Sequence, residues 1–427
     1  MNGEPIGAEE MHGTVSADNA QRPLGVARLS KLAFDGADLN PIWRDLLRRF
    51  VYQPEDAAAL MDLSIVEQIF GDREIGIAHQ VRALKIQRVY PSRCSVAPSL
   101  RLLAFAAPGD VGANAPLEFL LEGSDIELVT LYLPPGEPLP SEVPEHDLAI
   151  VAIAQSEAHR PQLEALSEIR KAWPRPILNP PERMLDLSRE RLHRLLRGAP
   201  GIEMPETARI ARSDLMALTL DAFALAALLP NGAFPLIARP LDSHAGLGLA
   251  KLDAPEAIPL YLRERPEAEF ALARFVDYRA TDGLYRKYRI AFIDGRAYPV
   301  HMALTDQWAI WYLNAGMKDD VQKRAEEALF MTEFETGFAR RHERALAAIQ
   351  ERLGLDYFAI DCAETADGKL LLFEADVAMI VHDMDDPAIY PYKRPQMRRL
   401  FAAFQEMVRR GAARSLLAVS SQLPNKG

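Results

Sequence analysis

Apolar residues change their spacing along the chain, and each change marks a region with its own predicted structure. Residues 23–90 carry apolar positions at helical spacing, and residues 41–51 (PIWRDLLRRFV) open with a proline suited to a first helical turn. Residues 100–107, 126–133 and 147–154 are instead continuous apolar runs, separated by loops and short helical segments. Fully apolar strands that alternate with helices are typical of a parallel sheet covered on both faces.

Two hairpins are predicted in the second half of the chain. The basic hairpin, residues 285–300, turns at Asp294-Gly295, and the acidic hairpin, residues 356–386, turns at Asp367-Gly368. Asp-Gly between apolar runs is the strongest short hairpin signal. We therefore predict an α/β protein with α+β character in its C-terminal part. Its regions are a disordered tail (1–22), a helical accessory domain (23–95), a parallel α/β domain (96–180) and a domain with antiparallel sheets (181–427).

The acidic hairpin brings carboxylates together if Asp367 and Gly368 form a two-residue turn. In that register Asp361 faces Glu374, and because side chains alternate along a strand, Glu374 and Asp376 share a face. Directly opposed like charges destabilise a pair of strands. A divalent cation is the simplest group that offsets them, and oxygen ligands favour magnesium, which also takes oxygens from substrate phosphates. The alternative is a solvated hairpin with incidental acids, which its apolar strands disfavour.

Basic and glycine-containing segments could serve the same ligand. Lys287 and Arg289 point to one face of the basic hairpin, a pattern that by itself is also typical of a solvated sheet face. The strand 234–238 delivers Arg239 to a loop of small residues, where glycines let backbone amides approach phosphate oxygens. The loop 109–115 follows a strand of the parallel sheet and could touch a ligand or be a plain connection. The two hairpins and the Arg239 loop together suit a magnesium–triphosphate.

Charge and cysteine content exclude several classes of function. The net charge of −11 disfavours non-specific binding to nucleic acid. Two cysteines, Cys94 and Cys362, provide no disulfide framework or zinc site, and no apolar run is long enough to span a membrane. We expect a cytoplasmic protein with no nucleic-acid or membrane partner. The helical accessory domain has no catalytic motif, so its expected roles are packing or formation of a homo-oligomer.

Residues 100–410 together resemble the ATP-grasp superfamily, close to the glutathione-synthetase and RimK-like ligases. That family places a parallel α/β domain before a two-lobed nucleotide clamp with antiparallel sheets, which is the order predicted here. Asp361, Glu374 and Asp376 match its magnesium ligands, in the family pattern Asp…Glu-x-Asn. Lys287 and Arg289 fall where the family places catalytic cations for phosphate or substrate.

The resemblance also implies a set of nucleotide-binding residues. Arg239 and the loop after it look like the loop that covers the phosphates, and residues 274–277 look like the hinge whose backbone reads adenine. An earlier phosphate cation is expected near residues 189–191. The implied ATP-contacting residues are Arg189, Arg191, Arg239, Ser243, His244, Gly246, Gly248, Arg274, Phe275, Val276 and Asp277.

Three positions depart from the family pattern. Arginine stands in place of the usual lysine at position 239 and again at residues 189–191. Arginine binds phosphate through the several donors of its planar guanidinium, whereas the ammonium of lysine acts as a point charge. Asp376 replaces asparagine and adds a negative charge. These changes are compatible with ATP binding and raise the alternative that turnover has been lost.

The function implied by the resemblance is that of an ADP-forming ligase that uses ATP with Mg²⁺, or Mn²⁺ in its place. A small-molecule or peptide carboxylate would become an acylphosphate and then be joined to an amine or a thiol. Two alternatives stay open. One is a nucleotide-binding scaffold or regulatory protein without turnover, and the other is a small-molecule kinase that uses the same clamp.

Overall fold

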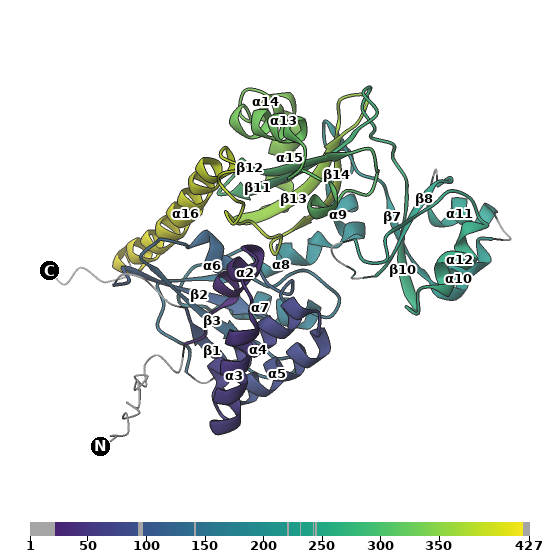
Figure 1. Ribbon diagram of the computed structural model, residues 1–427. Coiled ribbons are helices and arrows are strands. Elements are labelled where there is room, and N and C mark those ends of the chain that lie inside the picture. The colour runs from purple at the N-terminus through teal and green to yellow at the C-terminus, as the bar shows by residue number, and fades with distance from the viewer. Residues whose placement is uncertain are drawn as a thin grey trace, which may run out of the picture.

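The computed structural model describes residues 22–92, 97–140, 142–219, 222–230, 232–241, 243 and 246–421. The predicted disordered tail, apart from Arg22, lies outside the described residues, as do Cys94 and His244. Figure 1 shows three parts: the N-terminal helices with a first sheet, a second sheet capped by helices, and a smaller lobe at the side. None of the helices in the described residues has the length and apolar character needed to cross a membrane.

The accessory region is helical, as predicted. It contains α2 (Val26–Phe34), α3 (Asn40–Tyr52), α4 (Ala57–Phe70) and α5 (Arg73–Ile86). Their apolar faces share a core that includes Leu29, Leu46 and Leu63. A side chain at Gly76 of α5 would lie 2.6 Å from the carbonyl oxygen of Ser64 of α4, so glycine lets these two helices approach closely.

The first sheet has the strand order β1-β3-β2-β4-β5. Its strands β2 (Leu100–Ala106), β3 (Ile126–Tyr132) and β4 (Leu148–Val151) are parallel, as their continuous apolar runs predicted, and the short strand β5 (Ile177–Leu178), which was not predicted, extends the parallel arrangement. Strand β1 (Val89–Pro91) pairs antiparallel with β3 at the edge, so the chain leaving α5 becomes part of the sheet. Helices α6 (Leu117–Leu120) and α7 (Arg160–Arg170) occur between these strands along the chain.

The accessory helices hold the loop that follows β2. Gln68 and Gln80 accept hydrogen bonds from backbone amides of this loop, and Arg73 forms an ion pair with it. The contacts are Gln80 Oε1 with Gly109 N (2.7 Å), Gln68 Oε1 with Val111 N (2.9 Å) and Arg73 Nη2 with Asp110 Oδ2 (2.9 Å). One structural role of this helical region is therefore to fix the loop at one end of the parallel sheet.

The smaller lobe has its own sheet and core. Its strand order is β7-β10-β8-β9, and all its strand pairs are antiparallel. The strands are β7 (Thr207–Ala211), β8 (Leu236–Pro240), β9 (Ala250–Leu252) and β10 (Glu269–Arg274). Two short helices, α10 (Arg212–Ala217) and α11 (Ala222–Leu228), lie with α12 (Ala257–Arg263) beside the sheet (Figure 1).

The larger lobe is built on the second five-stranded sheet, with the order β12-β11-β13-β14-β6. It combines β6 (Ile202–Glu203), β11 (Tyr285–Ile293), β12 (Arg296–Thr305), β13 (Tyr357–Glu364) and β14 (Leu370–Asp376). Between β12 and β13 the chain forms α13 (Val321–Thr332), α14 (Phe338–Arg341) and α15 (Glu343–Leu353). Before β6 the chain forms α8 (Pro181–Met184), a 3₁₀ turn η1 (Leu185–Leu187) and α9 (Arg189–Leu196).

Two connections hold the larger lobe against the first sheet. Asn179 lies just after β5 and contacts the start of β13. Its side-chain Oδ1 accepts from the backbone amide of Tyr357 (2.9 Å), and its backbone amide donates to Oδ2 of Asp356 (2.7 Å). The C-terminal helix α16 (Lys393–Ser421) runs from the larger lobe to the first sheet (Figure 1). At Gly411 an added side chain would lie 3.1 Å from Leu148 of β4, so glycine permits this close approach.

Candidate functional site

The acidic hairpin forms, but its turn is longer than predicted. Thr365 and Lys369 close the turn through a 3.0 Å backbone hydrogen bond, which leaves three residues, 366–368, in the loop. Gly368 has φ +78°, the left-handed conformation that this kind of three-residue loop requires. The prediction of a two-residue turn was wrong because Asp-Gly can also supply the last two positions of a three-residue turn.

A β-bulge restores the register that brings the acids face to face. Near the turn, Cys362 pairs with Leu372, whereas the next pair beyond is Asp361 with Glu374, so Phe373 is an extra residue in β14. The bulge compensates for the longer turn, and the predicted pairing of Asp361 with Glu374 is confirmed. Bulges re-aim side chains, and this one determines which face of the sheet Glu374 occupies.

The buried carboxylate of Asp361 binds two cations from the neighbouring strand β11. Lys287 Nζ lies 2.6 Å from its Oδ2, and Arg289 donates from Nε to Oδ1 (2.8 Å) and from Nη2 to Oδ2 (3.0 Å). Lys287 and Arg289 therefore share a face, as the alternation along the strand predicted. Burial alone would raise the pKa of Asp361, but Arg289 and Lys287 hold this pKa well below its usual range.

Glu374 is held by two other cations. It forms an ion pair with Arg189 of α9, and its Oε2 lies 4.0 Å from Nη1 of Arg239 at the end of β8. Burial opposes ionisation of Glu374, but Arg189 and then Arg239 and Lys287 lower its pKa. Since Arg239 belongs to the smaller lobe and Glu374 to the larger one, this contact crosses the boundary between the lobes.

The predicted group of three carboxylates does not form a metal site in the chain alone. Within the described residues, no group of three His, Cys, Asp or Glu side chains could hold a metal ion. Asp361 and Glu374 pair with different basic residues, and these cations offset the opposed negative charges. Asp376 accepts from the amide of Ala378 (3.0 Å), and burial raises the pKa of its carboxyl to about 6.

Arg239 is fixed by the loop that it introduces. Its Nε donates to Ser243 Oγ (3.0 Å), and its Nη2 donates to the carbonyl oxygen of Ser243. Burial, together with nearby Arg189, lowers the pKa of Arg239 to about 10. Further along the loop, Gly246 and Gly248 have φ +74° and +67°, and a side chain at Gly248 would lie 2.6 Å from Pro240. These glycines are required by the path of the loop.

The other predicted phosphate cation is not in the site. Arg191 lies two residues beyond Arg189 on α9, so the two side chains leave the helix in different directions. The nearest acidic partner of Arg191 is Asp186, at 3.9 Å. The structure thus brings Arg189, and not Arg191, to the carboxylates.

Residues 274–277 connect the two lobes, as a hinge would. Arg274 ends β10 and pairs with Glu203 of β6 (2.8 Å), while the amide of Phe275 donates to the carbonyl of Pro235 (3.0 Å). The centres of the Phe275 and Trp308 rings are 5.8 Å apart. Val276 packs against the core of the larger lobe, and Asp277 accepts from the amide of Arg279 (3.1 Å). A hollow of about 190 Å³ lies beside this hinge, lined by His193, Met204, Pro205, Glu206, Leu229, Pro230, Gly232 and Arg274.

A buried polar network next to the site was not found from the sequence. Lys393, at the start of α16, lies 3.3 Å from Glu327 of α13 and 3.1 Å from Asp385, and the hydroxyl of Tyr312 donates to Glu327 (3.1 Å). These residues lie far apart along the chain and form no motif. No local signal marks them in the sequence, because Glu327 and Lys393 lie among other charged residues of their helices.

His301 connects this network to the cations. It is the cross-strand partner of Arg289, and its ring centre lies 4.8 Å from that of Tyr312. Burial, with the nearby charges of Arg289 and Lys393, lowers the pKa of His301 well below its usual value. His301 is therefore neutral near pH 7, and its Nδ1 has no hydrogen-bond partner among the described residues.

Comparisons with known proteins give similarities of overall structure. No protein-family profile matches the chain, and no curated protein matches it. The D-alanine–D-alanine ligase from Bacillus anthracis complexed with ATP is 13% identical, with a TM-score of 0.45, over 74% of this chain and 98% of that one. A RimK-domain ATP-grasp protein from Sphaerobacter thermophilus is 16% identical, with a TM-score of 0.40, over 72% and 99%. The D-alanine–D-alanine ligase from Coxiella burnetii is 10% identical, with a TM-score of 0.47, over 76% and 99%.

Proposed function

We propose that the chain is an ATP-grasp ligase that binds ATP between its two lobes and joins a carboxylate to an amine, with release of ADP and phosphate. One observation carries the proposal: basic side chains outnumber carboxylates around the three predicted metal ligands of the acidic hairpin. Four basic side chains face three acids, and they are Arg189, Arg239, Lys287 and Arg289 against Asp361, Glu374 and Asp376. Surplus positive charge in a partly buried site favours a polyanion such as a triphosphate.

The origin of these cations supports binding between the lobes. Arg239 comes from the smaller lobe, Lys287 and Arg289 from the larger lobe, and Arg189 from the helix that precedes both. An anion that reached all four would therefore bridge the two lobes. The hinge at residues 274–277 also joins the two lobes, and the base of a nucleotide would have room beside it.

The two basic residues of β11 differ in how many donors they keep for a ligand. Arg289 uses Nε and Nη2 on Asp361 and Nη1 on the carbonyl of Ile380. Lys287 has one partner in the described residues, and its ammonium has three donors. We assign Lys287 to the transferring phosphoryl group and Arg289 to positioning Asp361.

The acidic residues fit a metal that arrives with the nucleotide. Mg²⁺ is usually bound by one or two carboxylates together with substrate phosphates rather than by an all-protein cage. Asp361, Glu374 and Asp376 supply suitable oxygens, but in the chain alone the surrounding cations repel a further positive charge. These three residues would hold the metal, which would neutralise charge on the phosphates.

The proposed reaction has two steps. An oxygen of the substrate carboxylate attacks the γ-phosphorus of ATP, the bond from that phosphorus to the β–γ bridging oxygen breaks, and ADP leaves. The amine nitrogen then attacks the carbonyl carbon of the acylphosphate, the carbon–oxygen bond to phosphate breaks, and the nitrogen loses a proton to solvent. Lys287 and Arg239 would stabilise the negative charge on the phosphoryl oxygens.

The experiment is product analysis with the full chain, ATP, Mg²⁺, a pool of carboxylic acids and hydroxylamine. We expect ADP, phosphate and a hydroxamate by mass spectrometry, because hydroxylamine traps an acylphosphate. The Lys287→Met variant should make no hydroxamate. AMP and pyrophosphate would overturn the proposal. A stable phosphorylated acid without hydroxamate would identify a kinase, and ATP binding without any product would identify a scaffold.

A further inference from the structure

A pocket of about 420 Å³ lies beneath helix α2, and Asp361, Glu374 and Asp376 take no part in its lining. It is enclosed by α2, the strands β1 and β3, the turn after α6, and residues 383–384 of the loop that follows β14. None of the residues proposed above to bind ATP or metal lines it. Its volume is in the range of about 300–1,000 Å³ that is typical of small-molecule sites.

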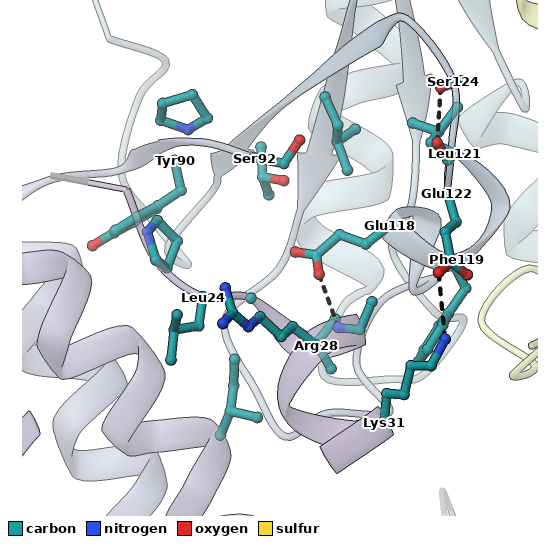
Figure 2. A pocket seen from close by; sticks show the side chains of 18 of the residues that line it. Leu24, Arg28, Lys31, Tyr90, Ser92, Glu118, Phe119, Leu121, Glu122 and Ser124 are labelled. Atoms are coloured by element: carbon teal, nitrogen blue, oxygen red, sulfur yellow. Dashed lines mark hydrogen bonds and ion pairs between the residues drawn. The ribbon is translucent and has the colours of Figure 1, made fainter. Parts of the chain in front are cut away.

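The walls of this pocket are apolar along one side and polar along the other. Leu24, Met61, Ile65, Leu121, Ile126 and Leu128 are among the residues that supply the apolar surface. Arg28 extends from α2 toward the side formed by Leu24 and Tyr90 (Figure 2). A ligand that fills the pocket would therefore contact an apolar wall and a guanidinium at the same time.

The acidic side chains of the pocket already have partners, whereas Arg28 has none among the residues that the structure describes. Glu118 accepts from the amide of Ala27 (2.8 Å), as Figure 2 shows, and Glu122 pairs with Lys31 (3.5 Å). The third acid, Asp383, lies 3.9 Å from Arg394. Among the described residues, the Arg28 guanidinium makes no ion pair or hydrogen bond.

Tyr90 contributes ring surface to the pocket rather than an accessible hydroxyl. Its side chain lines the pocket and is buried, and its hydroxyl has no partner within the described part of the chain. The pocket thus combines an unpaired cation, Arg28, with an apolar wall.

We propose that this pocket binds a small monocarboxylate with an apolar body, with Arg28 pairing with the carboxylate. The fork of a guanidinium matches the two oxygens of a carboxylate. A dianion such as phosphate is disfavoured because Glu118, Glu122 and Asp383 surround the single unpaired cation. The proposal goes beyond the ligase function and is independent of it, since no residue is shared between the two sites.

The test is calorimetric titration of the full chain with octanoate and with probes that lack one of its features. Octanoate should bind at one site per chain. Acetate, which lacks the apolar body, and octanol and octylamine, which lack the negative charge, should bind at least about tenfold more weakly. Absence of saturable octanoate binding would overturn the proposal, and so would tighter binding of octylamine than of octanoate.

Variants locate the site. Arg28→Gln should weaken octanoate binding at least about tenfold. The matched control is Arg48→Gln, which removes an exposed arginine from α3 outside the pocket and should leave binding unchanged. Thr130→Phe on β3 should block the pocket without changing its charge. Melting curves establish that each variant is folded. Octanoate binding that survives both Arg28→Gln and Thr130→Phe would place the ligand elsewhere and overturn the proposal.

Discussion

Asp361 and Glu374 face each other across β13 and β14, yet their carboxylates bind different cations. Asp361 pairs with Lys287 of the neighbouring strand β11, whereas Glu374 pairs with Arg189 of helix α9. The repulsion between two opposed acids is thus offset before any ligand arrives. In the proposed function, this arrangement keeps both carboxylates ionised and brings cations to the place where phosphates would bind.

Glu374→Gln should abolish ligase turnover while the protein stays folded. The substitution keeps the shape of the side chain but removes the charge that pairs with Arg189 and that would bind metal. ADP formation is the measurement. Glu364→Gln is the matched control, because Glu364 lies on the same hairpin but contacts Arg341 and His342 outside the site. Full activity of Glu374→Gln would contradict its assignment as a metal ligand.

Arg239→Ala should weaken ATP binding by about 1.5–3 kcal/mol, the range for hydrogen bonds to charged groups. Arg239→Lys should keep much of the affinity, since a cation remains at the end of β8. Arg263→Ala, which removes an exposed arginine from α12 of the same lobe, serves as the control. Calorimetry measures all three. If Arg239→Ala binds ATP as the parent does, then the placement of the phosphate loop is wrong.

Lys393→Met should cost about 3–5 kcal/mol of stability, because it leaves the buried carboxylate of Glu327 without its cation. Burial already raises the pKa of Glu327, and Lys393 counteracts that shift. Combining Lys393→Met with Glu327→Gln should recover part of the loss. Lys369→Met, which breaks a surface pair with Asp367, should change stability by less than about 1 kcal/mol. Equal losses for Lys393→Met and Lys369→Met in urea denaturation would refute the network.

Glu118 makes stability depend on pH. Burial, assisted by Asp62, raises its pKa to about 7, so the folded state favours the neutral acid. The folded chain holds this proton where the unfolded chain has lost it, and stability falls as pH rises from about 4.5 to 7. Glu118→Gln should therefore stabilise the protein by about 1–2 kcal/mol at about pH 8, and by much less at about pH 5.

Urea denaturation at the two pH values measures this effect. Glu122→Gln is the control, since Glu122 is more exposed and pairs with Lys31 at the surface. It should show no difference between the two pH values. A gain for Glu118→Gln that is the same at both would mean that the carboxyl is not neutral in the folded state.

Local signals in the sequence predicted most elements and the central pairing. The Asp-Gly turns, the continuous apolar strands and the alternation along β11 depend on neighbouring residues, so they are legible without a structure. The register of Asp361 with Glu374 was correct only because the longer turn and the bulge at Phe373 cancel. A bulge is set by packing against other strands, which no local pattern encodes.

Contacts between distant segments could not be predicted. The orientation of α9 determines that Arg189, and not Arg191, pairs with Glu374, and nothing in the sequence distinguishes the two arginines. The ion pair of Lys393 with Glu327 joins residues on two helices that are adjacent only in the folded chain. The cations at Asp361 were each identified, but their direct contact with this carboxylate required β11 to lie beside β13.

The most direct test of the proposed site is calorimetry of nucleotide and metal, added separately and together. The surplus of cations around Asp361 and Glu374 predicts that Mg²⁺ alone gives no binding. It also predicts that ATP with Mg²⁺ binds at one site, at least about tenfold more tightly than ATP with EDTA. Binding of Mg²⁺ to the nucleotide-free chain, combined with an ATP affinity that EDTA leaves unchanged, would contradict the account.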